Sequence, residues 1–411
     1  MEKVLIVGAG AQGGACASIL ARDKEVSEIV LSDIDLDLAN RVKDKIGSDK
    51  ITTVKIDAGK TEDIERAAKG ADVIINLTLV RFNPNIMKAA VRNGAHYVDA
   101  AFGELIWTQI TKNRAIELDG EFKEAALTAL IGCGGSPGIS NVLARYICDK
   151  LDHVVEICIR DGTKRLEETK EVIKVWEPDW CPEIALTDYA AEPTVFENGM
   201  YRTYLPFSGC EEYDFPDPVG SVLISYHSHE EAVMLPRFIG KGVKDVWFKF
   251  PIDPIAGALI KLGFASSEPI DVKGVKVAPK DVLLKLIRHP VEDFLTEDES
   301  NAKLPSRFIE PMIMEVKGKK SGEDVKYTIS WFYSIFTNAE EKLGFYKKFG
   351  TTNIAVALPA IVGAKMCMEG NAEKGVIGPE CLDPIKFLRM MADMGAPVKF
   401  HEMFSKEISI S

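Results

Sequence analysis

A glycine-rich segment near the start of the chain, residues 8–13 (GAGAQG), follows a short apolar strand and opens a helical pattern. In this arrangement Gly8 permits a tight turn, Gly10 lets the backbone approach a pyrophosphate, and Gly13 lets the helix pack closely on the strand. The free N–H groups at the start of the helix, around Ala11 and Gln12, attract the charge of the diphosphate. The spacing therefore predicts a dinucleotide site formed by Gly8, Gly10, Ala11, Gln12 and Gly13.

A carboxylate at the end of the next strand indicates which dinucleotide is bound. Asp33 lies about 20 residues after Gly13, the distance at which an acidic residue binds the adenosine ribose hydroxyls. Asp35 adds negative charge, and no arginine stands beside Asp33 to receive a 2′-phosphate. The pattern favours NAD over NADP, and we expect Asp33 and Ile34 to contact it.

Polar residues also follow the expected fourth, fifth and sixth strands. Ligands of an open α/β sheet lie beyond the carboxyl ends of its strands. We expect Thr78 and Gly134, which follow the fourth and sixth strands, to contact the cofactor. Asp99 ends the fifth strand and could bind a substrate ammonium or act as a base, or it could simply cap a loop. Glu104 supports a weaker version of the same argument.

Two histidines are candidates for proton transfer. His227 and His229 are two residues apart on a strand pattern, so their side chains could face the same way. Histidine titrates near neutrality and is the natural acid or base. A pair of histidines at this spacing could also bind a metal ion, but no third ligand stands at local spacing, so we expect no metal. The alternative for each is a strand-end histidine without a role.

An amino-acid substrate would also need a carboxylate clamp, for which the bidentate fork of arginine is suited. We expect Arg81, which follows the fourth strand, and Arg237 to form this clamp in preference to Arg145 and Arg160.

The elements that position these residues divide the chain into two kinds of structure. Up to about residue 150, short apolar strands alternate with helical patterns, which is typical of βαβ units on a parallel sheet. Beyond it, antiparallel strand patterns predominate, including a hairpin of residues 308–316 and 325–334 around a polar turn. Residues 354–367 and 379–394 are helical again and should pack back on the first unit.

Composition narrows the class of protein. The chain has 411 residues, too many for one core, and a net charge of −12. That sign disfavours a protein that coats nucleic acid or an anionic membrane, since basic residues supply most of such affinity. No cysteine pair has C-x-x-C spacing, no apolar run approaches about 18 residues, and the N-terminus does not read as a signal peptide. We expect a cytoplasmic protein.

Several of these segments together resemble the saccharopine dehydrogenase-like family, which includes saccharopine reductases, carboxynorspermidine dehydrogenases and lysine 6-dehydrogenases. The resemblance rests on GAGAQGG at residues 8–14, Asp33, YVD at 97–99, GGSPGISN at 134–141, SHEE at 228–231, LPR at 235–237 and GVIGPE at 375–380. Asp33 departs from the Ser-Arg pair that NADP-using reductases often have there.

The resemblance implies a Rossmann-type parallel sheet domain with an inserted α+β domain of largely antiparallel sheet. We expect residues 1–150 plus 350–411 to form the NAD-binding domain, and residues 151–349 to form the domain that binds substrate and forms a homodimer. It also implies hydride transfer at a carbon–nitrogen bond, with Asp99, His227 and His229 as catalytic candidates and Arg81, Glu104 and Arg237 as substrate contacts.

The sequence thus predicts an NAD-dependent oxidoreductase that acts on the CH–NH bond of an amino acid or amine through an imine, most like lysine 6-dehydrogenase or saccharopine dehydrogenase. Two alternatives stay open. One is reductive condensation of an amine with a keto acid or aldehyde, and the other is an NAD-binding sensor or scaffold without turnover.

Overall fold

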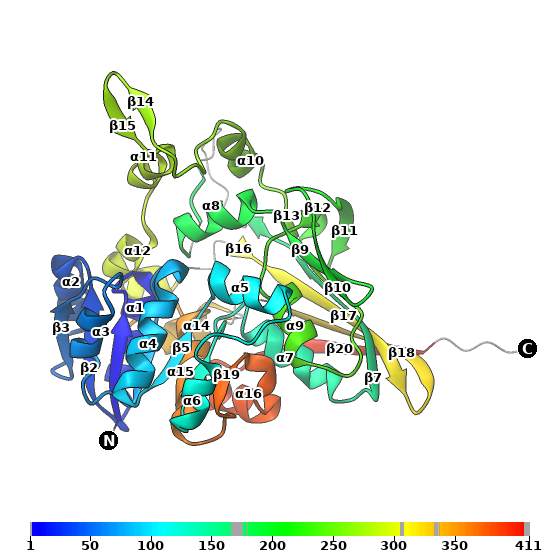
Figure 1. Ribbon diagram of the computed structural model, residues 1–411, viewed down its shortest axis with the longest axis horizontal. Coiled ribbons are helices and arrows are strands. Elements are labelled where there is room, and N and C mark those ends of the chain that lie inside the picture. Colours follow the sequence, from blue (N-terminus) through cyan, green and yellow to red (C-terminus); the bar gives the residue numbers. More distant parts are fainter. Residues whose placement is uncertain are drawn as a thin grey trace, which may run out of the picture.

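A parallel sheet and a mixed sheet lie side by side in the computed structural model, which describes residues 2–165, 176–178, 180–304, 308–332, 336 and 338–406 (Figure 1). The parallel sheet has the order β19-β6-β5-β4-β1-β2-β3. Its strands are β1 (Glu2–Val7), β2 (Val26–Asp33), β3 (Ile51–Lys55), β4 (Val73–Asn76), β5 (His96–Asp99), β6 (Thr128–Leu130) and β19 (Gly375–Ile377). This is the predicted Rossmann-type sheet, with one strand added from the end of the chain.

Helices cover both faces of the parallel sheet because its strands carry apolar side chains on both sides. They are α1 (Ala11–Ala21), α2 (Leu36–Ile46), α3 (Thr61–Ala67), α4 (Asn83–Asn93), α5 (Glu104–Thr111), α6 (Asp119–Glu124) and α15 (Ala357–Met368), with a 3₁₀ turn at Val80–Phe82. Val4 and Ile6 pack into one core with α1 and α15, while Leu5 and Val7 pack into a second core with α3 and α4.

The second sheet has the order β10-β9-β13-β7-β17-β18-β20, and β12 pairs with both β13 and β11. Its strands are β7 (His153–Asp161), β9 (Thr194–Glu197), β10 (Met200–Thr203), β11 (Glu211–Phe215), β12 (Gly220–Tyr226), β13 (Asp245–Pro251), β17 (Pro311–Lys320), β18 (Glu323–Phe332) and β20 (Phe400–Lys406). All its pairs are antiparallel except β13 with β7. The predicted fold class is confirmed. The predicted hairpin is confirmed as β17 paired with β18, but Phe308 and Ile309 belong to β16 (Phe308–Ile309), which pairs with β8 (Lys164–Arg165), and residues 333–334 lie outside the described residues.

The remaining elements connect or cover the two sheets. They are α7 (Ile139–Cys148), α8 (Pro182–Ala190), α9 (Glu231–Phe238), α10 (Pro254–Lys261), α11 (Pro279–Leu286), α12 (Pro290–Thr296), α13 (Glu299–Ala302), α14 (Ala339–Phe349), α16 (Pro384–Asp393), a 3₁₀ turn at Pro379–Cys381, and the short strands β8 (Lys164–Arg165), β14 (Ile270–Val272), β15 (Val275–Val277) and β16 (Phe308–Ile309). No helix among the described residues is long and apolar enough to cross a bilayer.

The end of the chain differs from the expected return of residues 350–411 to the first unit. α15 and β19 do join the parallel sheet, but β20 pairs along its length with β18 of the second sheet. The reason is that β18 offered an unpaired edge, and a strand beside it satisfies the backbone N–H and C=O groups of both. The domain limits therefore stay a prediction, with β20 assigned to the second sheet.

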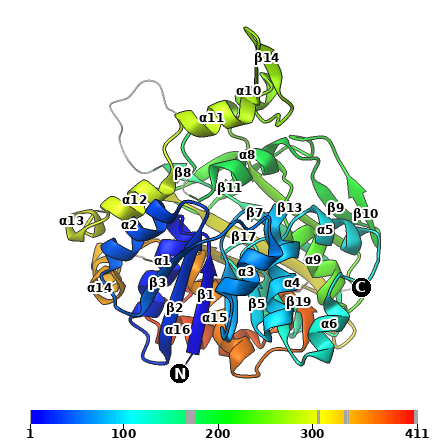
Figure 2. The same cartoon turned by 60° about the vertical axis from the view of Figure 1, so that its left-hand side comes forward.

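A segment of the second unit reaches across to α1, the helix that follows the glycine turn. α12 lies against α1 and α2 (Figure 2). The Phe294 ring lies over Gly14, where a Cβ atom would come within 2.7 Å of it, and Arg41 pairs with Glu292 at 3.1 Å. The two sheets are therefore joined by apolar packing as well as by the chain.

Replacing Phe294 by alanine should destabilise the protein. The side chain is 2% exposed, so its removal loses buried apolar area and leaves a cavity. We expect the free energy of unfolding to fall by about 3–5 kcal/mol, measured by urea denaturation. Leu286→Ala is the matched control, because that side chain is 78% exposed and should change stability little. Equal effects of the two substitutions would contradict this packing role.

Candidate active site

The glycine turn has the geometry that a dinucleotide requires. Gly8 has φ +101°, and a Cβ atom there would lie 2.8 Å from the Leu77 carbonyl oxygen. A Cβ atom on Gly13 would lie 1.8 Å from the Gly8 carbonyl oxygen, so only glycine allows α1 to approach β1 this closely. Gly10 precedes α1 and has open space where a Cβ atom would be. This cradle, with the N–H groups of α1 behind it, fits a pyrophosphate.

Asp33 and Gln12 lie beside this turn. The Ala9 N–H donates to Asp33 Oδ2 at 2.7 Å, so the carboxylate at the end of β2 also holds the glycine turn in place. The next side chain, Ile34, is 63% exposed. Gln12 Nε2 donates to Asn353 Oδ1 at 2.9 Å, while its buried Oε1 has no hydrogen-bond partner among the described residues. A carboxylate and an exposed aliphatic side chain suit the adenosine end of the cofactor.

Thr78 and Gly134 lie at neighbouring strand ends. A Cβ atom on Gly8 would lie 3.2 Å from Thr78 N, which places Thr78 directly against the glycine turn. The N–H of the buried Gly134 donates to the Pro137 carbonyl at 2.8 Å, so this amide is already used within its own turn. Gly134 could serve the cofactor by close backbone approach. Both contacts remain predictions.

Asp99 is enclosed by donors from its own domain. Its Oδ2 accepts hydrogen bonds from Tyr97 Oη at 2.8 Å and Asn83 Nδ2 at 2.9 Å, and its Oδ1 accepts one from Gly132 N at 2.7 Å. Burial raises the pKa of Asp99 to about 8 despite the donors from Gly132 and Tyr97. These contacts make Asp99 a positioning residue for the turn after β6. A direct role of Asp99 with substrate remains a prediction.

His229 is bound to a buried carboxylate at the start of α9. Its Nδ1 makes a short hydrogen bond to Glu231 Oε2, and its ring stacks on Phe248 with centroids 4.1 Å apart. Glu231 is completely buried, and its Oε1 accepts hydrogen bonds from the hydroxyls of Ser136 and Ser140. Ser136 belongs to the turn after β6, and thus the pair lies at the carboxyl edge of the parallel sheet.

The charges of this group are strongly coupled. Burial by itself would lower the pKa of His229, but Glu231, Glu230 and Asp188 outweigh it and raise the pKa to about 9. Burial would raise the pKa of Glu231, yet His229 and the two serine hydroxyls hold it below its ordinary value. At neutral pH the pair is therefore an imidazolium beside a carboxylate.

His227 has the opposite character. Its ring lies against Tyr189 and Phe250, with centroids 4.8 and 4.9 Å away. Burial and the charge of His229 lower its pKa to about 3, so it is neutral at physiological pH. The two histidine rings are 6.1 Å apart. The structure thus brings the two predicted histidines close together and gives them different charge states, with His229 protonated and His227 neutral.

Further carboxylates surround His229. Burial raises the pKa of Asp161 and of Asp188, and the charge of His229 opposes both shifts. Burial also raises the pKa of Glu230 to about 7. Asp161 is 8% exposed, and its Oδ1 has no hydrogen-bond partner among the described residues. Such an acidic surrounding favours a positively charged ligand, because an ammonium group would stabilise the ionised carboxylates.

The same residues offer a set of metal ligands, contrary to the expectation that no third ligand stands at local spacing, since Glu230 and Glu231 directly follow His229. One atom each of His229, Glu230 and Glu231 lies within 4.8 Å of the others. However, both oxygens of Glu231 already accept hydrogen bonds, and the facing nitrogen of His229 is one of the donors. The donor set fits an ion pair better than a cation site.

The other predicted residues lie apart from this group. Arg81 is exposed and pairs with Glu183 of α8 at 2.8 Å, so it faces the second unit. Arg237 is exposed at the far end of α9 and donates to Asn113 Oδ1 at 3.2 Å. Glu104 is an exposed first residue of α5. None of the three contacts His229 through a described interaction, and their substrate roles remain predictions.

Sequence reasoning did not assign Glu230, Glu231, Asp161 or Asp188 to the site. The sequence does contain a signal for Glu230 and Glu231. They directly follow His229 and precede the apolar run of α9, and acidic residues are favourable at a helix N-terminus. Asp161 and Asp188 lie 41 or more residues before His229, and only the fold brings them to it.

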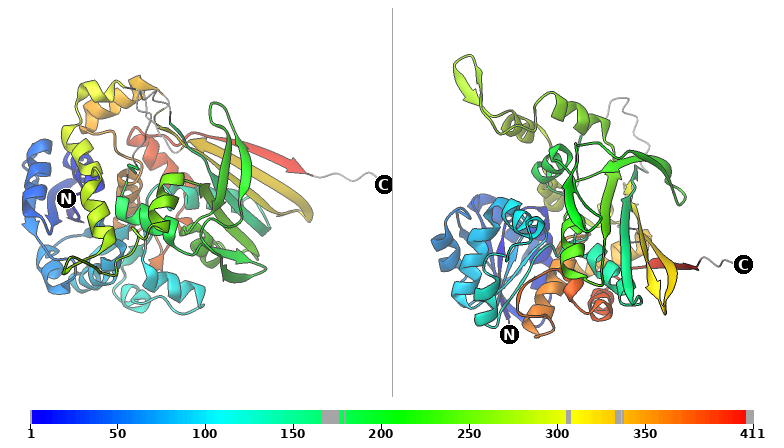
Figure 3. Two further views of the ribbon diagram at one scale, coloured as in Figure 1. Left: turned by 90° about the horizontal axis from the view of Figure 1, so that it is seen from above. Right: turned by 45° about the vertical axis from the view of Figure 1, so that its right-hand side comes forward.

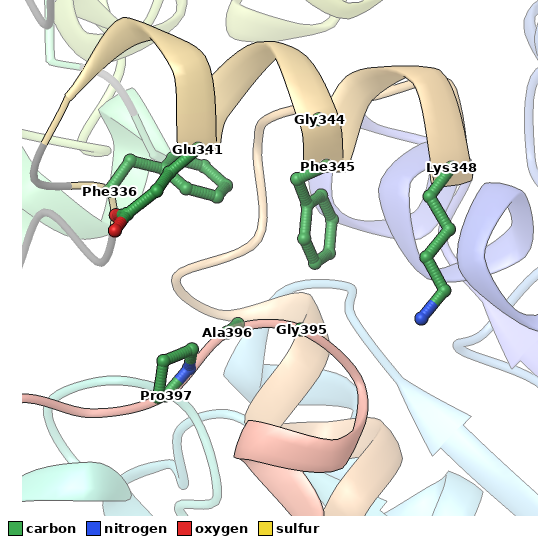
Figure 4. A pocket seen from close by; sticks show the side chains of 8 residues that line it. All are labelled: Phe336, Glu341, Gly344, Phe345, Lys348, Gly395, Ala396 and Pro397. Carbon is green, nitrogen blue, oxygen red and sulfur yellow. The ribbon is translucent and has the colours of Figure 1, made fainter.

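A pocket elsewhere does not belong to this site. It lies between α14 and the segment after α16 (Figure 4) and is lined by Phe336, Glu341, Gly344, Phe345, Lys348, Gly395, Ala396 and Pro397. Its phenylalanines give it an apolar wall, and it carries no candidate residue named above.

Comparison with known proteins covers almost the whole chain. Residues 4–130 match the saccharopine dehydrogenase NADP binding domain, and residues 134–396 match the saccharopine dehydrogenase C-terminal domain. Carboxyaminopropylagmatine dehydrogenase of Synechocystis sp. is 25% identical over 98% of each chain. Carboxynorspermidine synthase of Vibrio cholerae is 23% identical over 95% of each.

Two solved structures share the fold. Saccharopine dehydrogenase (L-Glu forming) from Saccharomyces cerevisiae has a TM-score of 0.67 at 14% identity, over 98% of this chain and 100% of that one. Homospermidine synthase from Legionella pneumophila, in complex with NAD, has a TM-score of 0.62 at 13% identity, over 98% of this chain and 91% of that one.

Replacing Glu231 by glutamine should lower the pKa of His229. The substitution keeps the shape but removes the adjacent negative charge that holds the imidazolium. The pKa should fall below about 9 and can be followed by NMR of labelled histidine rings. Glu230→Gln is the matched control, because Glu230 lies 3.9 Å from the ring nitrogen and should produce a smaller shift in the same direction. A larger shift from Glu230 would show that the pairing is wrong.

Proposed function

Since the chain belongs to the saccharopine dehydrogenase family and is an NAD(P)-dependent oxidoreductase of amine substrates, we propose that it uses NAD at the CH–NH bond of an amine through an imine. We propose His229, paired with Glu231, as the group that gives and takes the proton. The observation that carries this proposal is the charged His229–Glu231 pair at the edge of the parallel sheet beside the turn after β6. We further propose that the protein is cytoplasmic and a homodimer, as the family resemblance implies.

The choice of NAD is supported by Asp33. Its carboxylate accepts from Ala9 N and Asp35 N and lies where the ribose of the cofactor would be, so a 2′-phosphate would meet negative charge. The matching family model is described as NADP binding, and a homospermidine synthase of the same fold contains NAD. For this chain we propose that the Asp33 carboxylate decides in favour of NAD.

The nicotinamide ring, when bound, would accept or return a hydride at the carbon next to the reacting nitrogen. The residues of this chain manage the protons and the charge. An imidazolium at His229 can donate a proton to a departing hydroxyl when amine and carbonyl condense, and the resulting neutral imidazole can take one back. Glu231 stabilises the charged form, and its serine donors hold it in position.

The protonated state of His229 at neutral pH favours reductive condensation as the physiological direction. Related proteins carry the names dehydrogenase and synthase, so the direction is not decided by likeness. Oxidation requires His229 to act first as a base, and a group with a pKa of about 9 is mostly protonated at pH 7.

The acidic surrounding suggests the kind of amine. Asp161, Asp188 and Glu230 lie around His229, and one oxygen of Asp161 lacks a partner among the described residues. We propose a substrate with additional ammonium groups, which agrees with relatives named for agmatine and norspermidine derivatives. Those names also specify a carboxyl group, for which Arg81, Arg237 and Glu104 remain proposed contacts.

Wild-type protein should bind NAD more tightly than NADP, and Asp33→Ser should reverse part of this difference. The substitution removes a charged acceptor for the ribose hydroxyls and the repulsion of a 2′-phosphate. We expect about tenfold weaker NAD binding, measured by calorimetry. Asp35→Ser is the control, since Asp35 caps α2, a role that serine can keep, and this substitution should reduce the preference less than Asp33→Ser. A wild-type preference for NADP would refute the cofactor assignment.

The reductive reaction should slow as the pH rises through about 9. Below this value His229 keeps the proton that the condensation requires, and above it the acid is lost. We expect NADH consumption with polyamines plus a keto acid or a carboxyl-bearing aldehyde to follow this profile. His229→Asn should lower kcat by about 10²–10⁴-fold and remove the dependence near pH 9.

Replacing His227 provides the control for the His229→Asn experiment. His227→Asn should cost less than His229→Asn, because His227 is neutral and enclosed by aromatic rings. If both variants retain full turnover, the proton-transfer assignment is wrong although the enzyme assignment stands. NAD binding without turnover in either direction, over a panel of amines, would favour the sensor alternative.

A further inference from the structure

A completely buried carboxyl group lies behind the candidate site. Glu380 belongs to the 3₁₀ turn at Pro379–Cys381, which packs against α7 and α9. The orange end of the chain, which contains this turn, lies between the blue and the green parts of the molecule in the right-hand view of Figure 3. Burying a carboxyl group costs free energy unless it is hydrogen-bonded, so the contacts of Glu380 should show what it holds in place.

A chain of polar contacts joins Glu380 to the pair formed by His229 and Glu231. Asn141 Nδ2 donates to Glu380 Oε2 at 3.0 Å. Asn141 Oδ1 lies 3.2 Å from the Ser140 hydroxyl, and this hydroxyl donates to Glu231 Oε1. Glu231 in turn binds the His229 ring. Ser140, Asn141, Glu231 and Glu380 are each 0% exposed, so bulk water does not compete for these contacts.

The orientation of the Asn141 amide is decided at both of its ends. Its Oδ1 accepts from Gly138 N at 3.0 Å, and a backbone N–H can only donate. Its Nδ2 must then face the other way, where the acceptors are Glu380 Oε2 and, at 3.8 Å, Met234 Sδ. A thioether sulfur is a weak acceptor compared with a carboxyl oxygen. Glu380 is therefore the group that keeps Asn141 in this orientation.

The orientation of Asn141 affects Ser140, because a hydroxyl has only one hydrogen to donate. Gly138 N already supplies a donor to Asn141 Oδ1, so the hydrogen of Ser140 is left for Glu231. If the amide turned over, its Nδ2 would face the N–H of Gly138, donor against donor, and α7 would lose the bond between its first turn and Gly138. A disturbed first turn would move Ser140 away from Glu231.

The surroundings of Glu380 indicate that it serves as an acceptor. A Cβ atom on Gly378 would lie 2.6 Å from Glu380 Oε2 and 2.5 Å from Met234 Cε, so glycine lets the carboxyl group pack beside α9. Glu380 Oε1 has no hydrogen-bond partner among the described residues. Burial raises the pKa of Glu380 to about 7, although Asn141 donates to it. A neutral carboxyl group can accept from Asn141 Nδ2 as the ionised one does.

We propose that Glu380 is a positioning residue for the His229–Glu231 pair: its Oε2 fixes Asn141, which leaves Ser140 free to hold Glu231 against His229. Its importance for turnover rests on the proposed role of His229 in proton transfer. Residues 134–141, 228–231 and 375–380, which are far apart in the sequence, thus form one unit behind the site.

Two substitutions of Glu380 separate its acceptor oxygen from its charge. Glu380→Gln keeps an oxygen within reach of Asn141 Nδ2, whereas Glu380→Asp keeps the charge and withdraws the oxygen by one methylene. We expect Glu380→Gln to stay close to wild type in kcat and in the His229 pKa of about 9. Glu380→Asp should lower kcat by up to about 10²-fold with little change in KM. It should also lower the pKa of His229, measured by NMR of labelled histidine rings, because Glu231 is less firmly held beside the ring.

A control and a double variant complete the test. Glu373→Asp alters an exposed side chain of the same segment and should change neither quantity. If Glu380 acts through Ser140, Glu380→Asp should add little to the effect of Ser140→Ala on the pKa of His229. Should Glu380→Asp not fold, Glu380→Met makes the same comparison, since it fills the space without a carboxyl oxygen.

Two results would overturn the proposal. One is a loss of function in Glu380→Gln together with retention in Glu380→Asp, which is the pattern of a required charge. The other is full additivity of Glu380→Asp and Ser140→Ala. The NMR measurement needs no substrate, so it tests the positioning separately from the reaction. If His229→Asn keeps full turnover while Glu380→Asp still lowers the pKa of His229, the proposed function fails and the positioning of the pair is confirmed.

Discussion

The ion pair between His229 and the completely buried Glu231 is the interaction on which the site depends. A carboxylate without exposure to water is costly unless its charge is matched and its oxygens are hydrogen-bonded. Here His229 supplies the charge, and Ser136 and Ser140 supply the remaining donors. Because the serines come from the turn after β6 and the beginning of α7, this pair joins α9 to the carboxyl end of the parallel sheet.

The surroundings of His227 and His229 give these two histidines different charge states, although they lie only two residues apart. His229 keeps its proton because carboxylates surround it, whereas His227 loses its proton because aromatic rings do. Asp99 and Glu231 form a similar contrast. Three donors of its own domain enclose Asp99, so it orders the turn after β6, while Glu231 acts on a histidine that faces the acidic surroundings.

Much of the nucleotide half could be predicted because its signals are local. Gly8, Gly13 and Asp33 act through backbone geometry and strand ends within about 30 residues, and the structure places them in contact around one turn. Prediction was weaker where contacts are distant in the sequence. Residue type favours Arg81 and Arg237 as carboxylate contacts, but the pairing of these two arginines with Glu183 and Asn113 is decided by which helices fold against them. β20 joined the second sheet because an unpaired edge was available there, which no local pattern encodes.

By itself, the sequence determined the Rossmann-type unit, the dinucleotide turn, the mixed second unit and the family. Tertiary structure decided which histidine is charged, since the pKa of His229 depends on Asp188 as well as on the adjacent Glu230 and Glu231, and the pKa of His227 depends on its burial and on the charge of His229. It also decided that the β14–β15 hairpin stands away from the body with its aliphatic face uncovered. The physical reason is common to both: charge state and exposure depend on what surrounds a side chain, and long-range folding sets those surroundings.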